Sequence, residues 1–229
     1  MVKVGVVYSI VRDLCNKDQK GFVTPAVFNT LAEAAQMNVY NEMFNELKLA
    51  TRLRRSGSDA GRDKSAYKMV EEDLSNFMKT SNLQSGDDGL TVLKPGDLSR
   101  IISMHVDDTN TSVEVIYDAE KLKRVLNSNL SAPTEDFPVA LVSQYTIDVF
   151  PEEIGDDVVI TYYRYPVPPL YSVKEISDGF VIEDTVNSTD FELPDHYLTE
   201  LVGEIARMIG VRLRDDVLMQ YGVAETTNR

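Results

Sequence analysis

The sequence predicts a segregated α+β protein, with helices toward both ends and a mainly antiparallel β region between them. Three observations lead to this prediction. Apolar residues recur at helical spacing between positions 24 and 79, the pattern changes to short strands from Leu90 onward, and helical spacing returns after Asp190. Because helices and strands are grouped rather than alternating, we expect the first and last helical parts to pack against each other.

The N-terminal region, residues 1–82, reads as a short helix followed by a helical hairpin. Apolar residues at helical spacing predict a helix over residues 3–15. Thr24 before Pro25 is a typical helix start, because a hydroxyl caps the first turn and proline suits its first position. One apolar face then continues to Ala50, and a second helix is expected over residues 65–79.

A basic segment joins the two helices of this hairpin, on an otherwise acidic chain. The net charge is −14, yet residues 48–68 hold seven basic residues against Asp59 and Asp63. The Gly, Ser and charged residues of this segment predict a flexible loop over residues 53–65. This loop either docks on an acidic surface, such as one on a second copy of the chain, or holds DNA phosphates, or is a solvated connector. The candidate interaction residues in it and beside it are Arg52, Arg54, Arg55, Arg62 and Lys64.

Residues 83–190 form the predicted β region. Turn signals at Pro95-Gly96 and over residues 107–112 divide its first half into short strands, and residues 118–130 read as one short helix. Further strand candidates lie within residues 138–151, 156–165 and 179–184.

The sequence TYYRYPVPP, residues 161–169, ends one of these strands abruptly. Tyrosines are interspersed with polar residues, and prolines then remove backbone donors and stiffen the chain. The strand either packs its aromatic residues inside or lends them to a neighbouring copy. The prolines either set up a stiff arm that reaches a neighbour or simply end the strand before a surface loop. The candidate interaction residues are Tyr162, Tyr163, Tyr165, Pro166, Pro168 and Pro169.

The C-terminal region, residues 191–229, returns to helical spacing. Its apolar stripe begins near Leu193-Pro194 and continues to Leu218, with Gly210 expected to mark a bend. We expect this region to join residues 1–82 in one helical domain.

No nucleotide-binding, zinc-binding or catalytic motif stands out in the chain. His105 before an acidic turn fits a strand end, and His196 after Asp195 fits a helix start, so neither indicates a metal site. We therefore assign no catalytic, metal-binding or cofactor-binding residue and expect no membrane span. Two classes remain: a structural, assembly or scaffold protein inside the cell, and an enzyme whose site is built from scattered residues.

Two stretches of the chain resemble a known family. The sequence NKDQKGFVTPAVFNTLAEAAQMNVYNEMF, residues 16–44, resembles the opening of virion structural proteins of crAss-like tailed phages that infect Bacteroidetes. The sequences VVITYYRYPVPP, residues 158–169, and GFVIEDTVNSTDFELPDHYLTELVGEIARMIGVRLRDD, residues 179–216, are similar to the strand, proline turn, S-x-D-F-E-L-P motif and terminal helix of the same group.

This resemblance implies a head-to-tail connector, a ring-forming adaptor stacked below the portal protein. Such a protein forms a closed homo-oligomer, commonly a dodecamer, around the channel through which double-stranded DNA is packaged and ejected. The implied partners are further copies of the chain, the portal protein and other tail or ring proteins. The implied location is the head-tail junction of a virion assembled in the host cytoplasm, without catalysis or a cofactor.

Overall fold

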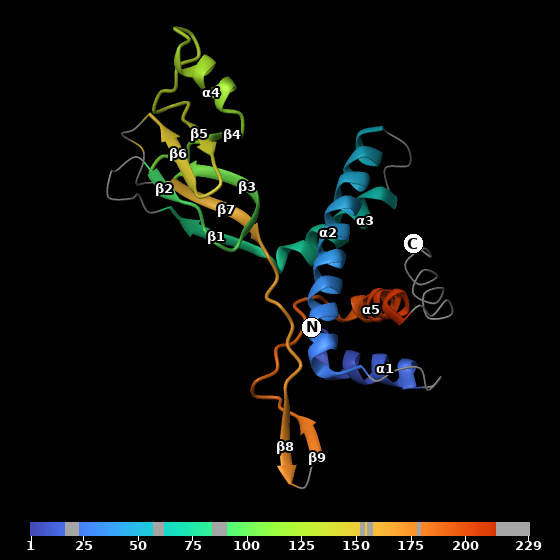
Figure 1. Ribbon diagram of the computed structural model, residues 1–229. Helices are drawn as coiled ribbons and strands as arrows, with labels where there is room; N and C mark the ends of the chain where they lie inside the picture. The colour runs from blue at the N-terminus through green and yellow to red at the C-terminus, as the bar shows by residue number, and fades with distance from the viewer. Residues whose placement is uncertain are drawn as a thin grey trace. The chain divides into compact units, whose positions relative to one another are not determined.

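The computed structural model describes residues 1–16, 23–56, 62–83, 91–151, 154, 158–177 and 180–213. Helices lie toward both ends of the chain, and the strands pair mostly antiparallel, which confirms the predicted α+β class. The chain divides into two compact units, Met1–Asn76 with Pro166–Arg229, and Phe77–Tyr165. We call these the helical unit and the β unit (Figure 1).

The helical unit combines elements from both ends of the sequence. The N-terminal part provides α1 (Val4–Asn16), α2 (Pro25–Ser56) and α3 (Arg62–Ser75). The C-terminal part provides the hairpin β8 (Val173–Ser177) and β9 (Phe180–Glu183), the short 3-10 helix η2 (Asp195–Tyr197) and α5 (Leu198–Leu213). α2 packs against α3 and α5, and α1 packs against α5, which confirms the expected contact between the first and last helices.

Local signals define the helix starts in this unit. Thr24 Oγ1 accepts a hydrogen bond of 3.3 Å from the Val27 N–H, and Pro25 is the first residue of α2, as predicted. The apolar stripes of the helices then form the core, where each buried large side chain contributes about 1.5–3 kcal/mol. Residues of this core with no exposed surface include Val4, Val7, Phe28, Tyr40, Met43, Leu74, Leu201 and Ile205.

The prediction of a loop over residues 53–65 is wrong at both of its ends, because both flanking helices extend into this range. α2 continues to Ser56 and α3 begins at Arg62, so Arg54 and Arg55 lie on the backbone of one helix. Leucine, arginine and lysine are good helix formers, and packing between α2 and α3 supports the added turns. Residues 57–61, the remainder of the loop, lie outside the described residues.

The end of the hairpin also differs from the prediction. α3 stops at Ser75 rather than near residue 79, and Met78–Asn82 form strand β1. Pairing with Val159–Tyr163 satisfies the backbone hydrogen-bonding groups of these residues. Because the partner strand lies far away in the sequence, residues 78–82 themselves show no alternating pattern. The predicted bend at Gly210 is likewise absent from the described chain, since α5 continues through Gly210 to Leu213.

The described residues of the β unit form two sheets and one α-helix. The strand order is β1-β7-β3 in one sheet and β2-β6-β5-β4 in the other, with β4 and β5 as the parallel pair. Asp118 caps α4 by accepting a hydrogen bond from the Glu120 N–H, and α4 ends at Leu126, before the predicted end at residue 130. The bounds are β1 (Met78–Asn82), β2 (Thr91–Leu93), β3 (Leu98–Val106), β4 (Glu114–Ile116), α4 (Ala119–Leu126), β5 (Val139–Val142), β6 (Thr146–Phe150) and β7 (Val158–Arg164).

The boundaries between the two units differ from those between the predicted regions 1–82, 83–190 and 191–229. The first change falls between Asn76 and Phe77, where α3 has ended and β1 follows. The second falls between Tyr165 and Pro166, so residues 166–190 belong with the helices. Hydrogen bonds from α2 to this segment are the physical reason.

Candidate interaction surfaces

The proline segment, residues 166–171, is held on α2 of its own chain by side-chain hydrogen bonds. The Asn29 side chain holds the backbone of Tyr171 at both ends: its Nδ2 donates to the Tyr171 carbonyl at 3.1 Å, and its Oδ1 accepts from the Tyr171 N–H at 2.8 Å. Pro166 and Pro169 are buried, whereas Pro168 is exposed. The segment is therefore part of the helical unit, although Val167 and Pro168 remain exposed on its surface.

Gln36 holds the same segment two turns further along α2. Its Nε2 donates to the Val167 carbonyl at 2.7 Å, and its Oε1 accepts from the Glu192 N–H at 3.0 Å. The Glu192 carboxylate in turn accepts from the Val167 N–H at 2.8 Å. Gln36 is only 1% exposed, so these bonds offset the cost of burying an amide.

Aromatic stacking fastens the base of the β8–β9 hairpin to α1 and α2. The rings of Tyr8 and Tyr171 stack with centroids 4.2 Å apart, and Phe28 meets Tyr8 edge-on at 5.1 Å. The Tyr8 hydroxyl donates to the Val23 carbonyl at 3.2 Å. Burial raises the pKa of both tyrosines above the usual value, so they remain neutral and polar only at the hydroxyl.

Asp190 ties the start of α1 to the chain that precedes α5. Its Oδ1 accepts from the Val4 N–H at 3.0 Å, and its Oδ2 accepts from Lys3 Nζ at 2.6 Å. Burial by itself would raise the pKa of Asp190, but the hydrogen bonds from Lys3 and Val4 outweigh it and lower the pKa. The carboxylate thus acts as a charged cap on α1.

The tyrosines of β7 have different environments. Tyr162 lies in the core of the β unit, fully buried, and its hydroxyl donates to Asp97 Oδ1 at 2.8 Å. Lys79 Nζ lies 2.7 Å from the other oxygen of Asp97, and this bond is the main reason that the Asp97 pKa is lowered. Tyr162 therefore packs inside and is closed to a partner. Tyr163 is half-buried, and Tyr165, just beyond β7, is 46% exposed.

The basic residues lie on the two helices that form the α2–α3 hairpin. Arg52 is exposed on α2, and so is Lys48 one turn earlier. Lys68 is exposed on α3. Of the other candidates, Arg54 and Arg55 lie on the last turn of α2, and Arg62 and Lys64 on the first turn of α3. We call Lys48, Arg52 and Lys68 the basic end of the hairpin.

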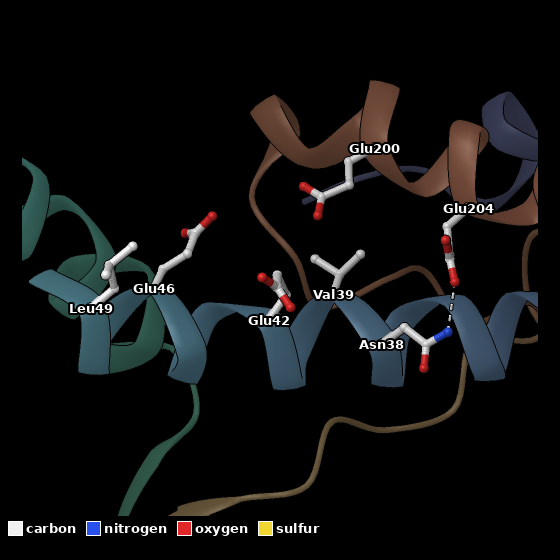
Figure 2. A pocket seen from close by; sticks show the side chains of 7 residues that line it. All are labelled: Asn38, Val39, Glu42, Glu46, Leu49, Glu200 and Glu204. Atoms are coloured by element: carbon white, nitrogen blue, oxygen red, sulfur yellow. Dashed lines mark hydrogen bonds between the residues drawn. The ribbon is translucent and has the colours of Figure 1, made fainter. Parts of the chain in front are cut away.

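A groove of about 500 Å³ lies between α2 and α5. Val39 and Leu49 provide apolar walls, and Leu49 is 57% exposed. Figure 2 shows glutamates of both helices pointing into the space between them, with Asn38 joined to Glu204. The lining residues are Asn38, Val39, Glu42, Glu46, Leu49, Glu200 and Glu204.

Both walls of this groove carry two glutamates one turn apart. Glu42 and Glu46 are four residues apart on α2, as are Glu200 and Glu204 on α5, and like charges at this spacing destabilise a helix by about 0.2–0.5 kcal/mol. Arg207 Nε donates to Glu204 at 2.9 Å, and Asn38 Nδ2 donates to it at 2.7 Å. The hydrogen bond from Arg207 does most to lower the pKa of Glu204. The bond from Asn38 adds to this effect, and together they outweigh burial, which would raise the pKa. The groove therefore brings together carboxyl groups of both helices, of which Glu204 is paired with Arg207.

Sequence reasoning missed both the residues that hold the proline segment and the glutamates of the groove. A signal for the first existed: Asn29 and Gln36 interrupt the predicted apolar side of α2 seven residues apart, and polar groups on a buried face need partners. A weaker signal for the second was the like-charged spacing on two helices. Their convergence in one groove has no signature in the linear sequence.

Among the described residues, no helix has the length and apolar character that a membrane crossing requires. In the same part of the chain, no three His, Cys, Asp or Glu side chains come together in a way that would hold a metal ion. In comparisons with known proteins, no family model matches the chain, and no curated protein matches its sequence.

Proposed function

We propose that this chain is a structural subunit of a tailed-phage virion, a connector that forms a ring at the head-to-tail junction. In this role, copies of the chain close around the DNA channel below the portal protein and link the capsid to the tail. The role requires surfaces that bind neighbouring proteins and requires no catalytic chemistry.

The observation that carries the proposal concerns the motifs that resemble crAss-like phage proteins. Asn29 and Gln36 belong to the stretch F-N-x-L-A-x-x-A-Q, and Asp190 and Glu192 belong to S-x-D-F-E-L-P. These four residues make the hydrogen bonds that hold the proline segment on α2 and cap α1. The resemblance therefore covers residues that work together in one structural junction, which supports a shared architecture over a chance match.

The charge of the chain also supports a place beside DNA that must slide. Of the 37 acidic residues, only Asp59 and Asp63 fall in the basic segment, so the rest of the chain is strongly acidic. DNA-binding proteins normally gain affinity from basic residues that contact phosphates. An acidic channel wall with few such contacts lets DNA pass without being held.

The test is to locate the chain and its assemblies. Purified particles of the phage should contain the chain in a fixed ratio to the portal protein, measured by quantitative mass spectrometry. The chain mixed with portal protein should give rings in negative-stain images. If the chain is absent from particles, stays monomeric and binds neither portal nor tail proteins, the proposal is wrong and the enzyme alternative gains weight.

A further inference from the structure

We propose that the β unit holds a basic pocket that receives an acidic turn from a second copy of the chain. The turn covers residues 134–137, with the sequence TEDF, and the pocket is lined by residues of both sheets. The proposal rests on the proposed function in one respect, because it assumes that copies of the chain assemble. It names one contact between them, so it can fail while the connector role stands.

The pocket has a volume of about 300 Å³ and gathers positive charge on a chain with 37 acidic and 23 basic residues. Lys94, directly after β2, and Arg100, on β3, both line it and are half-buried. Among the described residues that line the pocket, none carries a carboxylate. Lys94 forms no ion pair within the described part of the chain, so a carboxylate from outside would stabilise its charge.

A β-bulge shapes this pocket. Successive side chains of a regular strand point to opposite faces, yet residues 98–101 of β3 all line the pocket. The pairing with β7 shifts here, because Leu98 and Arg100 pair with consecutive residues of β7 and Ser99 is left over. Bulges redirect side chains and are common beside functional sites. This bulge brings Ser99 and Arg100 to the same pocket.

Apolar and aromatic side chains complete the lining. Leu98, Ile101 and Val142 are its aliphatic members, and Tyr117, directly after β4, is 69% exposed. Tyrosine and arginine are enriched among the residues that dominate protein interfaces. The volume lies at the low end of the range for ligand pockets, about 300–1,000 Å³. The pocket therefore suits one or two side chains, with a carboxylate beside an apolar group.

The turn over residues 134–137 has the complementary chemistry. The Phe137 N–H donates to the Thr134 carbonyl at 3.0 Å, and the Thr134 N–H donates to the Phe137 carbonyl at 3.4 Å, so Glu135 and Asp136 form the tip. Both acidic residues are exposed and form no ion pair within the described residues. Phe137 is 76% exposed. A preformed turn with an aromatic side chain beside two carboxylates loses little conformational entropy on binding.

The turn of one copy does not line the pocket of the same copy, because the two lie at opposite ends of β5. The turn ends just before Val139, the first residue of the strand, whereas Val142, its last residue, lines the pocket. A contact between the pocket of one copy and the turn of the next therefore joins two different surfaces. Its repetition produces a ring when the rotation between copies closes.

The experiment removes the turn chemistry in one full-length variant and the pocket charge in another. The turn variant is Glu135→Gln with Asp136→Asn and Phe137→Ala, and the pocket variant is Lys94→Glu, which repels the acidic turn. Each variant alone should associate with itself at least about tenfold more weakly than the wild-type chain, measured as apparent Kd by analytical ultracentrifugation. Mixed in equal amounts, the two should form one-to-one pairs, because one intact turn then meets one intact pocket.

The controls are Lys174→Glu and Val186→Ala, which make comparable changes at exposed positions of the helical unit. Both should associate like the wild-type chain. Circular dichroism should show every variant folded, and Lys94→Ala replaces Lys94→Glu if the latter does not fold.

Unchanged self-association of the folded turn and pocket variants overturns the inference, as does the absence of pairs on mixing. A wild-type chain that is monomeric at every concentration also overturns it. Binding of the wild-type chain to duplex DNA that Lys94→Glu abolishes, with self-association unchanged, would assign the pocket to phosphate groups instead. In each of these cases, presence of the chain in virions would still support the connector role.

Discussion

The side chain of Asn29 and the backbone of Tyr171 form two hydrogen bonds across 142 residues of sequence. One amide group thus satisfies both the N–H and the carbonyl of a residue that has no strand or helix partner at that point. Together with Gln36 two turns away, it holds an extended proline segment on α2. The contact joins the first and last parts of the chain into one helical unit.

Replacing Asn29 should therefore lower the stability of the helical unit. Asn29→Ala removes both hydrogen bonds and leaves a part-buried N–H and carbonyl without a partner, which costs about 1–3 kcal/mol. Urea unfolding followed by circular dichroism measures the loss. Asn41→Ala, at an exposed position on the same helix, is the matched control and should change the free energy of unfolding by less than about 0.5 kcal/mol. Equal stability of the two variants would contradict the role of Asn29.

The lowered pKa of Asp190 predicts that the folded chain loses stability in acid. Because its pKa is lower in the folded chain than in the unfolded chain, the unfolded state binds a proton more readily. Its contribution is present above the unfolded pKa of about 4 and is lost as the pH falls through the lower folded pKa. Asp190→Asn should flatten this part of the pH profile of the unfolding free energy.

Removing the partner of Asp190 tests the cause of that effect. Lys3→Met takes away the hydrogen bond that does most to lower the Asp190 pKa and leaves the Val4 N–H in place. The acid-dependent part of the stability should shrink in this variant without disappearing. A pH profile that stays the same in both variants would show that the Asp190 cap contributes nothing to acid sensitivity.

The β unit should fold when it is cut from the chain. Its ends meet within the unit, since the Arg164 N–H donates to the Phe77 carbonyl at 2.9 Å, and its buried residues form a core of their own. We expect residues 77–165 to give a strand-type circular dichroism spectrum and one cooperative unfolding transition. The companion experiment replaces residues 77–165 with a short Gly/Ser linker, which should leave the helical unit folded. An unfolded or aggregated fragment would mean that the β unit depends on the helices.

The sequence by itself determined the features that depend on near neighbours. The start of α2 follows from Thr24 and Pro25, and the end of β7 follows from the proline after Tyr165. α4 follows from an amphipathic stretch behind Asp118. These features could be predicted because helix hydrogen bonds, caps and proline geometry act within a few residues.

Only the tertiary structure decided which distant segments meet. Met78–Asn82 became a strand because β7 provides partners for its backbone, although four of its five residues are exposed and show no alternation. Residues 166–190 joined the helices because Asn29 and Gln36 hold their first part, which a reading by local spacing assigned to the β region. The acidic groove arises only where α2 and α5 pack together, bringing Glu42 within the same space as Glu200. Such contacts depend on the path of the whole chain. Residue spacing can indicate that Asn29 and Gln36 need partners, but it does not show which distant segment provides them.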